Sequence, residues 1–129
     1  MTRLLLDTRA FLWWLAGDER LSVRAREAVG EELDPIFVSA ASVWEIATRH
    51  RLGKLPAASA IVGGLAGVIE SQGFVCLAIT VRHGETAGAL PGPHRDPFDR
   101  MLIAQALLDD LVLVSNEQAF GAYGARLLW

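Results

Sequence analysis

The chain has 129 residues, a length typical of a single domain, and 52% of them are hydrophobic, so it is not an intrinsically disordered protein. Its formal net charge of −3 at pH 7 argues against a uniformly basic nucleic-acid-binding protein, although a local group of cations can still face a polyanion. The single cysteine, Cys76, excludes an internal disulfide, fits a reducing compartment and is expected to be a small buried hydrophobic residue.

Two apolar segments need to be distinguished from targeting or membrane segments. Leu4-Leu5-Leu6 lies near the N-terminus, but Asp7 and Arg9 interrupt it where a signal peptide would remain apolar. The longest uncharged run, 55–69, is shorter than the roughly 20 residues that a membrane-spanning helix needs. We therefore expect a cytoplasmic protein that does not enter a membrane.

The first half of the chain alternates between short apolar runs and helical patterns. In chain order, the expected elements are a strand at 3–6, helices at 9–16 and 22–29, a strand at 35–38 and a helix at 39–53. Thr8, Ser22 and Ser39 stand at the starts of the three helices and are expected to cap them.

The second half continues the alternation. Its expected elements are a helix at 58–70, a strand at 74–79, helices at 80–90 and 96–107, and strands at 111–114 and 126–129. Asp96-Pro97 is the clearest helix start, because it joins a capping carboxylate to a proline at the first helical position. Strands that are apolar on both faces and alternate with helices predict one α/β domain over 1–129, a three-layer α/β/α sandwich with a mainly parallel central sheet.

Four acidic residues lie just after predicted strands or in the helices that follow them. Asp7 follows the first strand directly, and Glu45 lies about two turns into the helix after the second. Asp99 is in the first turn of the helix that Asp96 begins, and Glu117 follows the strand at 111–114. Since ligands bind at the carboxyl ends of parallel strands, these side chains could converge.

Convergence would have an energetic consequence. Two carboxylates about 4 Å apart repel by roughly 4 kcal/mol at an effective dielectric constant near 20, so protons or a cation must neutralise several of them. Oxygen ligands favour Mg²⁺ or Mn²⁺ over Zn²⁺. Such carboxylate-bound ions can activate water for phosphodiester hydrolysis.

Each acid also has a purely structural interpretation. Asp7 could end a strand, Glu45 could be an exposed helix residue or pair with Ser42 in a capping box, Asp96 could be a helix cap, Asp99 a first-turn acid favoured by the helix dipole, and Glu117 a turn residue. Among the other residues, Trp44 and one of the neighbours Trp13 and Trp14 are expected in the core. The second tryptophan, with Phe11 or Leu15, could line a protein interface, and the three histidines are expected on the surface.

Several segments, taken in order, resemble the VapC-type PIN-domain toxins. They are Leu4-Leu5-Leu6-Asp7-Thr8, Ser42-Val43-Trp44-Glu45-Ile46-Ala47, Gly53-Lys54-Leu55, Arg95-Asp96-Pro97-Phe98-Asp99-Arg100, Ala104-Gln105-Ala106, Val114-Ser115-Asn116-Glu117 and the ending Tyr123-Gly124 to Leu128-Trp129. The resemblance spans essentially the whole chain. Its most specific parts are the hexapeptide at 95–100 and the block at 44–47.

The resemblance implies a Mg²⁺- or Mn²⁺-dependent endoribonuclease, the toxin of a VapBC-type toxin–antitoxin pair, which uses metal-activated water and leaves 5′-phosphate and 3′-hydroxyl ends. It implies that Asp7, Glu45, Asp99 and Glu117 form the metal-binding catalytic site, with Asp96 as an accessory acid or helix cap and with Thr8, Ser115 and Asn116 as supports. RNA would contact Arg9, Arg49, Arg51, Lys54 and Arg100, although the cations near Gly53 could instead form a solvated helix end. The implied protein partners are a VapB-type antitoxin and a second copy in a homodimer, with higher-order assembly on the antitoxin.

Two positions depart from the family pattern, because Arg9 stands where many relatives have His and Glu117 where many have Asp. A catalytically weak PIN-like module that binds a partner protein remains an alternative. A phosphatase or receiver-type domain is disfavoured, since Asp7 has no neighbouring acid and the only lysine, Lys54, is far from a late strand.

Overall fold

The computed structural model describes residues 3–129, which contain a five-stranded sheet in the order β3-β2-β1-β4-β5. The strands are β1 (Leu4–Leu6), β2 (Ile36–Ser39), β3 (Val75–Leu77), β4 (Val112–Val114) and β5 (Leu127–Leu128). Every strand pairing in these residues is parallel.

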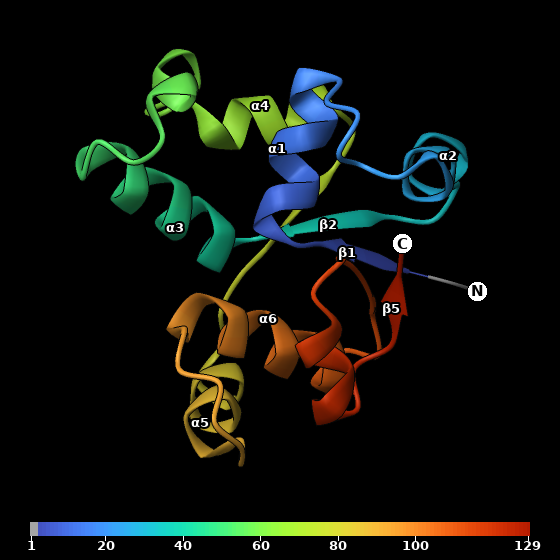
Figure 1. The fold of residues 1–129 in the computed structure, drawn as a ribbon, viewed down its shortest axis with the longest axis vertical. Coiled ribbons are helices and arrows are strands. Elements are labelled where there is room, and N and C mark those ends of the chain that lie inside the picture. The colour runs from blue at the N-terminus through green and yellow to red at the C-terminus, as the bar shows by residue number, and fades with distance from the viewer. Residues whose placement is uncertain (1–2) are drawn as a thin grey trace.

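Helices cover both faces of this sheet, as Figure 1 shows. They are α1 (Thr8–Ala16), α2 (Val23–Glu31), α3 (Ala40–Arg51), α4 (Leu65–Ser71), α5 (Val81–Ala89) and α6 (Pro97–Leu108), with 3₁₀ helices η1 (Pro56–Ala60) and η2 (Gln118–Tyr123). Helices α1 and α4 lie on one side of the sheet, and α5 and α6 lie on the other. The predicted three-layer sandwich is therefore confirmed.

The alternation of side chains along β1 divides the core into two parts. Leu4 and Leu6 pack with Phe11 and Ile69 on the face covered by α1 and α4. Leu5 points to the opposite face, where it belongs to a cluster with Leu102, Ile103 and Phe120. A run of leucines buried on both faces is what a central parallel strand requires.

The order of the strands creates a topological switch point beside β1. The chain runs outward from β1 to β2 and β3, then returns to the other side of β1 for β4 and continues outward to β5. Strands β1 and β4 are direct neighbours, with Leu6 paired to Val114, and the Asp7 amide donates to the Val114 carbonyl at 3.1 Å. Ligand sites of open α/β sheets form at the carboxyl ends of strands at such a point.

Most predicted helix starts are confirmed, and one is wrong. Ser22, Ser39 and Asp96 cap α2, α3 and α6 with their side chains. Helix α1, however, is capped by Asp7, whose Oδ1 accepts from the Ala10 amide at 2.7 Å, and Thr8 is the first helical residue. Both are good cap residues, so the local pattern could not decide between them.

Three further expectations in the middle of the chain are wrong. The helix expected at 58–70 is divided into η1 and α4, because Gly63 (φ +98°) lies in the left-handed region that interrupts a helix. The strand expected at 74–79 is limited to Val75–Leu77 and lies at the edge of the sheet. Cys76 is consequently exposed rather than buried.

Several aromatic and histidine side chains also differ from expectation. Trp44 is 59% exposed instead of lying in the core, whereas Phe11 is completely buried. Trp13 and Trp14 both pack partly buried against the core. His83 is also buried, and both of its ring nitrogens have partners: Nδ1 accepts from the Thr80 amide and Nε2 lies 3.0 Å from the Asp109 carboxylate.

None of the helices in the part of the chain that the structure describes is both long and apolar enough to cross a membrane.

Candidate functional site

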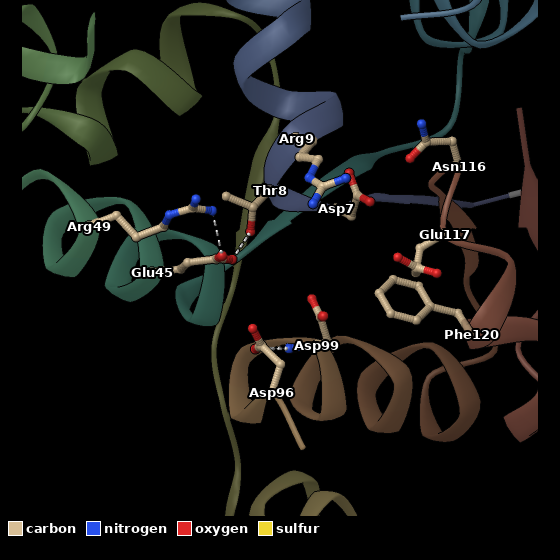
Figure 2. A pocket seen from close by; sticks show the side chains of 10 residues that line it. All are labelled: Asp7, Thr8, Arg9, Glu45, Arg49, Asp96, Asp99, Asn116, Glu117 and Phe120. Atoms are coloured by element: carbon tan, nitrogen blue, oxygen red, sulfur yellow. Dashed lines mark hydrogen bonds and ion pairs between the residues drawn. The ribbon is translucent and has the colours of Figure 1, made fainter. Parts of the chain in front are cut away.

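A cavity of about 80 Å³ lies at the carboxyl ends of β1 and β4, where the topology places the switch point. Figure 2 shows acidic side chains from separate segments turned toward this space. The cavity is lined by Asp7, Thr8, Arg9, Glu45, Arg49, Asp96, Asp99, Asn116, Glu117 and Phe120. The four acids singled out in the sequence, together with Asp96, therefore share one cavity.

Two of these acids are placed by helix starts. Asp7 leaves β1 and caps α1, so its carboxylate is fixed at the end of the central strand. Asp96 caps α6 by accepting from the Phe98 amide at 2.9 Å and the Asp99 amide at 3.0 Å. The cap holds the first turn of α6, from which Asp99 reaches the cavity. Asp96 thus serves as the helix cap and also contributes a carboxylate to the cavity wall.

Glu45 reaches the same cavity from the interior of α3. Its side chain is buried, which excludes the interpretation as an exposed helix residue, and Ser39 rather than Ser42 caps the helix. The Thr8 hydroxyl donates to Glu45 Oε1 at 2.7 Å, and Arg49 Nη1 lies 3.4 Å from Oε2. Thr8 therefore joins the start of α1 to the acid on α3.

Glu117 follows β4 through a short turn. Its amide donates to Ser115 Oγ at 3.0 Å, and its own Oε1 accepts from the Ala119 amide at 3.3 Å. Ser115 is buried at the end of β4, whereas Asn116 is exposed and lines the cavity. The serine hydroxyl thus fixes the turn that presents Glu117.

Burial raises the pKa values of the three innermost acids. For Asp7 it raises the pKa to about 6, against the opposing effects of the Ser115 hydroxyl and the Ala10 amide. For Glu45 and Asp99, burial again raises the pKa most strongly, hydrogen bonds from Thr8 and His94 oppose it, and the negative charge of Asp96 adds to it. Burial therefore disfavours the ionised forms of these carboxylates, and a bound cation would offset that cost.

The chemistry of the donors fits a hard divalent cation, since carboxylate oxygens dominate the cavity. Between residues 3 and 129, however, no three His, Cys, Asp or Glu side chains already surround a point that a metal ion could occupy. The carboxylates instead accept hydrogen bonds from protein groups, such as Thr8 for Glu45 and His94 for Asp99.

The predicted RNA-contacting cations divide into three groups. Arg9 and Arg49 line the cavity. Arg51 and Lys54 are exposed near the end of α3 and are not part of the cavity wall. Arg100 faces away from it and donates to the carbonyls of Ala87, Gly88, Leu90 and His94.

Two residues near the acids were missed in the sequence. His94, expected on the surface, places Nε2 2.9 Å from Asp99 Oδ2. Phe120 supplies the apolar floor of the cavity and is almost completely buried. Only the adjacency of His94 to the hexapeptide at 95–100 could have drawn attention to it, and no local signal marked Phe120.

Comparisons with known proteins agree with this arrangement. The model of the family described as "PIN domain" matches residues 4–125. The chain is 33% identical to Ribonuclease VapC22 of Mycobacterium tuberculosis (strain ATCC 25618 / H37Rv) over 119 residues, 92% of this chain and 89% of that protein.

Solved structures with little sequence identity share the fold. The structure of VapBC2 from Rickettsia felis bound to a DNA fragment from its promoter matches with a TM-score of 0.70 and 12% identity, covering 98% of each chain. That of Mycobacterium tuberculosis VapC20, a Sarcin-Ricin loop cleaving toxin, matches with a TM-score of 0.68 and 17% identity, covering 95% of each chain. With its parallel sheet and its acids at the end of β1 and β4, the chain therefore belongs to the PIN-domain family and is a relative of the VapC ribonucleases.

Proposed function

We propose that the chain is a Mg²⁺- or Mn²⁺-dependent endoribonuclease and the toxin of a VapBC-type pair. The observation that carries the proposal is the gathering of five carboxylates, from segments far apart in sequence, around one cavity at the switch point of the sheet. Identity to a protein named as a ribonuclease over most of both chains supports RNA as the substrate. The substrate's phosphodiester would enter where an ion can neutralise the acids.

Asp7, Glu45 and Asp99 would hold the ion directly or through water, and Glu117 would complete the site from the turn after β4. A bound divalent ion supplies activation of water and stabilisation of the charge that develops on the phosphate. Thr8 orients Glu45, Asp96 orders the first turn of α6, and Ser115 and Asn116 shape the turn at Glu117. These residues thereby keep the acids within reach of one another.

Arg9 and Arg49 are the cations best placed to contact the RNA phosphates next to the scissile bond, since both line the cavity. Arg51 and Lys54 would neutralise the backbone further along, on the exposed end of α3. Arg100 keeps only a structural role, because backbone carbonyls take up its guanidinium.

The proposed protein partners are a VapB-type antitoxin and a second copy of the chain, in the cytoplasm where RNA is available. Solved structures of the same fold include VapBC complexes from Rickettsia felis and Salmonella typhimurium, and these support a partner of this kind. In such a system the antitoxin-bound homodimer can assemble further.

The decisive experiment is cleavage of a labelled RNA by the purified protein in Mg²⁺, Mn²⁺ or EDTA, with the end groups of the products identified. Asp7→Asn and Asp99→Asn are expected to lower the rate by at least about a hundredfold, since each removes a charge that the ion needs. The matched control is Glu70→Gln, an exposed acid on α4 away from the cavity. Cleavage that persists in EDTA or in both Asn variants would contradict the proposal.

The alternative, a PIN-like module that only binds a protein partner, predicts a different result. The absence of a preformed ligand cluster among residues 3–129 is the observation in its favour. It predicts no Mn²⁺ binding by calorimetry and no RNA cleavage, with partner binding unaffected by Asp7→Asn.

A further inference from the structure

His94 lies in the segment between α5 and α6 and touches the acidic cavity through Asp99. Its Nε2 is 2.9 Å from Asp99 Oδ2, and both side chains are about a quarter exposed, at 23% and 28%. An ionised carboxylate can only accept a hydrogen bond, so Nε2 carries the proton and donates it. The contact joins the segment before α6 to the acid in the first turn of that helix.

The histidine is itself held from several sides. Its amide donates to the Tyr123 hydroxyl at 3.0 Å, and its carbonyl accepts from Arg100 Nη1 at 2.8 Å. Its ring packs edge-on against Phe120 and Tyr123, with centroid distances of 5.8 and 6.4 Å. With both its backbone groups and its ring fixed, His94 offers Asp99 a hydrogen-bond donor at a defined place.

The three acids proposed to hold the ion share one feature. Each has a carboxylate oxygen engaged by a protein donor: the Ala10 amide for Asp7, the Thr8 hydroxyl for Glu45 and the His94 imidazole for Asp99. In Glu45 the second oxygen also lies 3.4 Å from Arg49 Nη1. In Asp99, the donor on Oδ2 limits rotation of the carboxylate and leaves Oδ1 for another ligand. Mutation of outer-shell donors of this kind typically lowers metal affinity by roughly 10- to 100-fold.

We propose that His94 is a positioning residue that holds the Asp99 carboxylate in the orientation needed for divalent-ion binding. The inference rests on the proposed metal-dependent function and adds to it a residue outside the acidic set. Arg100 and Tyr123 would then act indirectly, because they hydrogen-bond the backbone of His94 rather than lining the cavity.

The test compares His94→Gln with His94→Asn by measuring Mn²⁺ affinity from the electron paramagnetic resonance signal of the free ion. The amide nitrogen of Gln can occupy the place of Nε2, whereas that of Asn is one methylene too short. We expect Asn to weaken Mn²⁺ binding by about tenfold or more, and Gln to stay within a few fold of wild type. RNA cleavage by the Asn variant should recover as Mn²⁺ is raised.

The control is His50→Asn, which removes another partly exposed histidine, one that contacts Ser59 away from the cavity, and should keep wild-type affinity. Equal Mn²⁺ affinity of wild type, Gln and Asn would overturn the inference alone, as would an equal loss in Gln and Asn. A wild type that cleaves RNA but binds no Mn²⁺, or does neither, would overturn the proposed function and the inference with it. If the Asn variant does not fold, Tyr123→Phe takes its place, because it frees the His94 backbone; unchanged Mn²⁺ affinity there would overturn the inference.

Discussion

The hydroxyl of Thr8 donates a 2.7 Å hydrogen bond to Oε1 of Glu45, which connects the first residue of α1 to the buried acid of α3. The two residues are 37 positions apart in sequence, and the contact is buried. Without this donor, the buried Glu45 carboxylate would lose the shorter of its two side-chain hydrogen bonds. The pair therefore couples the packing of two helices to the charge of the site.

Thr8→Val is expected to destabilise the protein by about 1 to 2 kcal/mol at pH 8, because the isosteric side chain leaves the Glu45 carboxylate without its donor. The hydrogen bond lowers the pKa of Glu45 against the larger effect of burial, so its loss raises that pKa further. The destabilisation should therefore shrink at acidic pH, where Glu45 is protonated. Urea unfolding at pH 8 and pH 4.5 measures it, and Thr8→Ser, which keeps the donor, should remain near wild type.

Asp7→Asn is expected to stabilise the metal-free protein at neutral pH while it abolishes RNA cleavage. Burial raises the folded-state pKa of Asp7 to about 6 from an ordinary value of 3.8. The folded state therefore holds this proton more tightly, and wild-type stability falls as pH rises from about 4 to 6, by about 3 kcal/mol in total. Asn removes that loss and can still cap α1.

Thermal unfolding in EDTA across pH 4 to 8 checks this prediction. The variant should unfold at a higher temperature than wild type at pH 8, and the difference should narrow toward pH 4. A variant less stable than wild type by the same amount at every pH would show that burial does not disfavour the ionised form of the Asp7 carboxylate.

Divalent ions are expected to stabilise the wild type and not the Asp7→Asn/Asp99→Asn double variant. An ion that binds only the folded chain raises the free energy of unfolding by about 2.7 kcal/mol at a free ion concentration of 100 times Kd. Differential scanning fluorimetry over a Mn²⁺ series should therefore raise the wild-type Tm by several degrees. A parallel rise in the double variant would indicate binding elsewhere, for example at surface acids.

The sequence predicted the layers and the acids better than the exposure of individual side chains. Leu4-Leu5-Leu6 followed by Asp7 predicted both a buried strand and a carboxylate at its end, because parallel strands and their ligand sites follow local rules. Trp44 could not be placed, since α3 contacts α1, α6 and η1 and still leaves the Trp44 side chain 59% exposed. His94 was missed because its role depends on Asp99, Tyr123 and Phe120, which no pattern within its own segment predicts.

Arg49→Gln is expected to reduce RNA affinity and its dependence on salt more than Arg51→Gln does. Arg49 lines the cavity, whereas Arg51 is exposed outside its wall. Loss of one phosphate contact lowers the slope of log affinity against log salt by about 0.7 for single-stranded RNA. Fluorescence anisotropy with the inactive Asp7→Asn background measures this slope without cleavage, and equal slopes for both variants would remove Arg49 from the RNA-contacting set.

Gly92→Ala is expected to destabilise the segment that carries His94. Gly92 has a φ of +99°, and a Cβ there would lie 2.7 Å from the Tyr123 hydroxyl, which accepts the hydrogen bond from the His94 amide. Backbone strain and the collision together should cost about 2 to 4 kcal/mol, measured by urea unfolding.

The matched control is Gly17→Ala, where φ is +62° but nothing lies within 4 Å of the new Cβ, so about 1 kcal/mol of strain alone is expected. Because the displaced Tyr123 also releases His94, Gly92→Ala should weaken Mn²⁺ binding whereas Gly17→Ala should not; equal Mn²⁺ affinity in the two variants would separate this segment from the site.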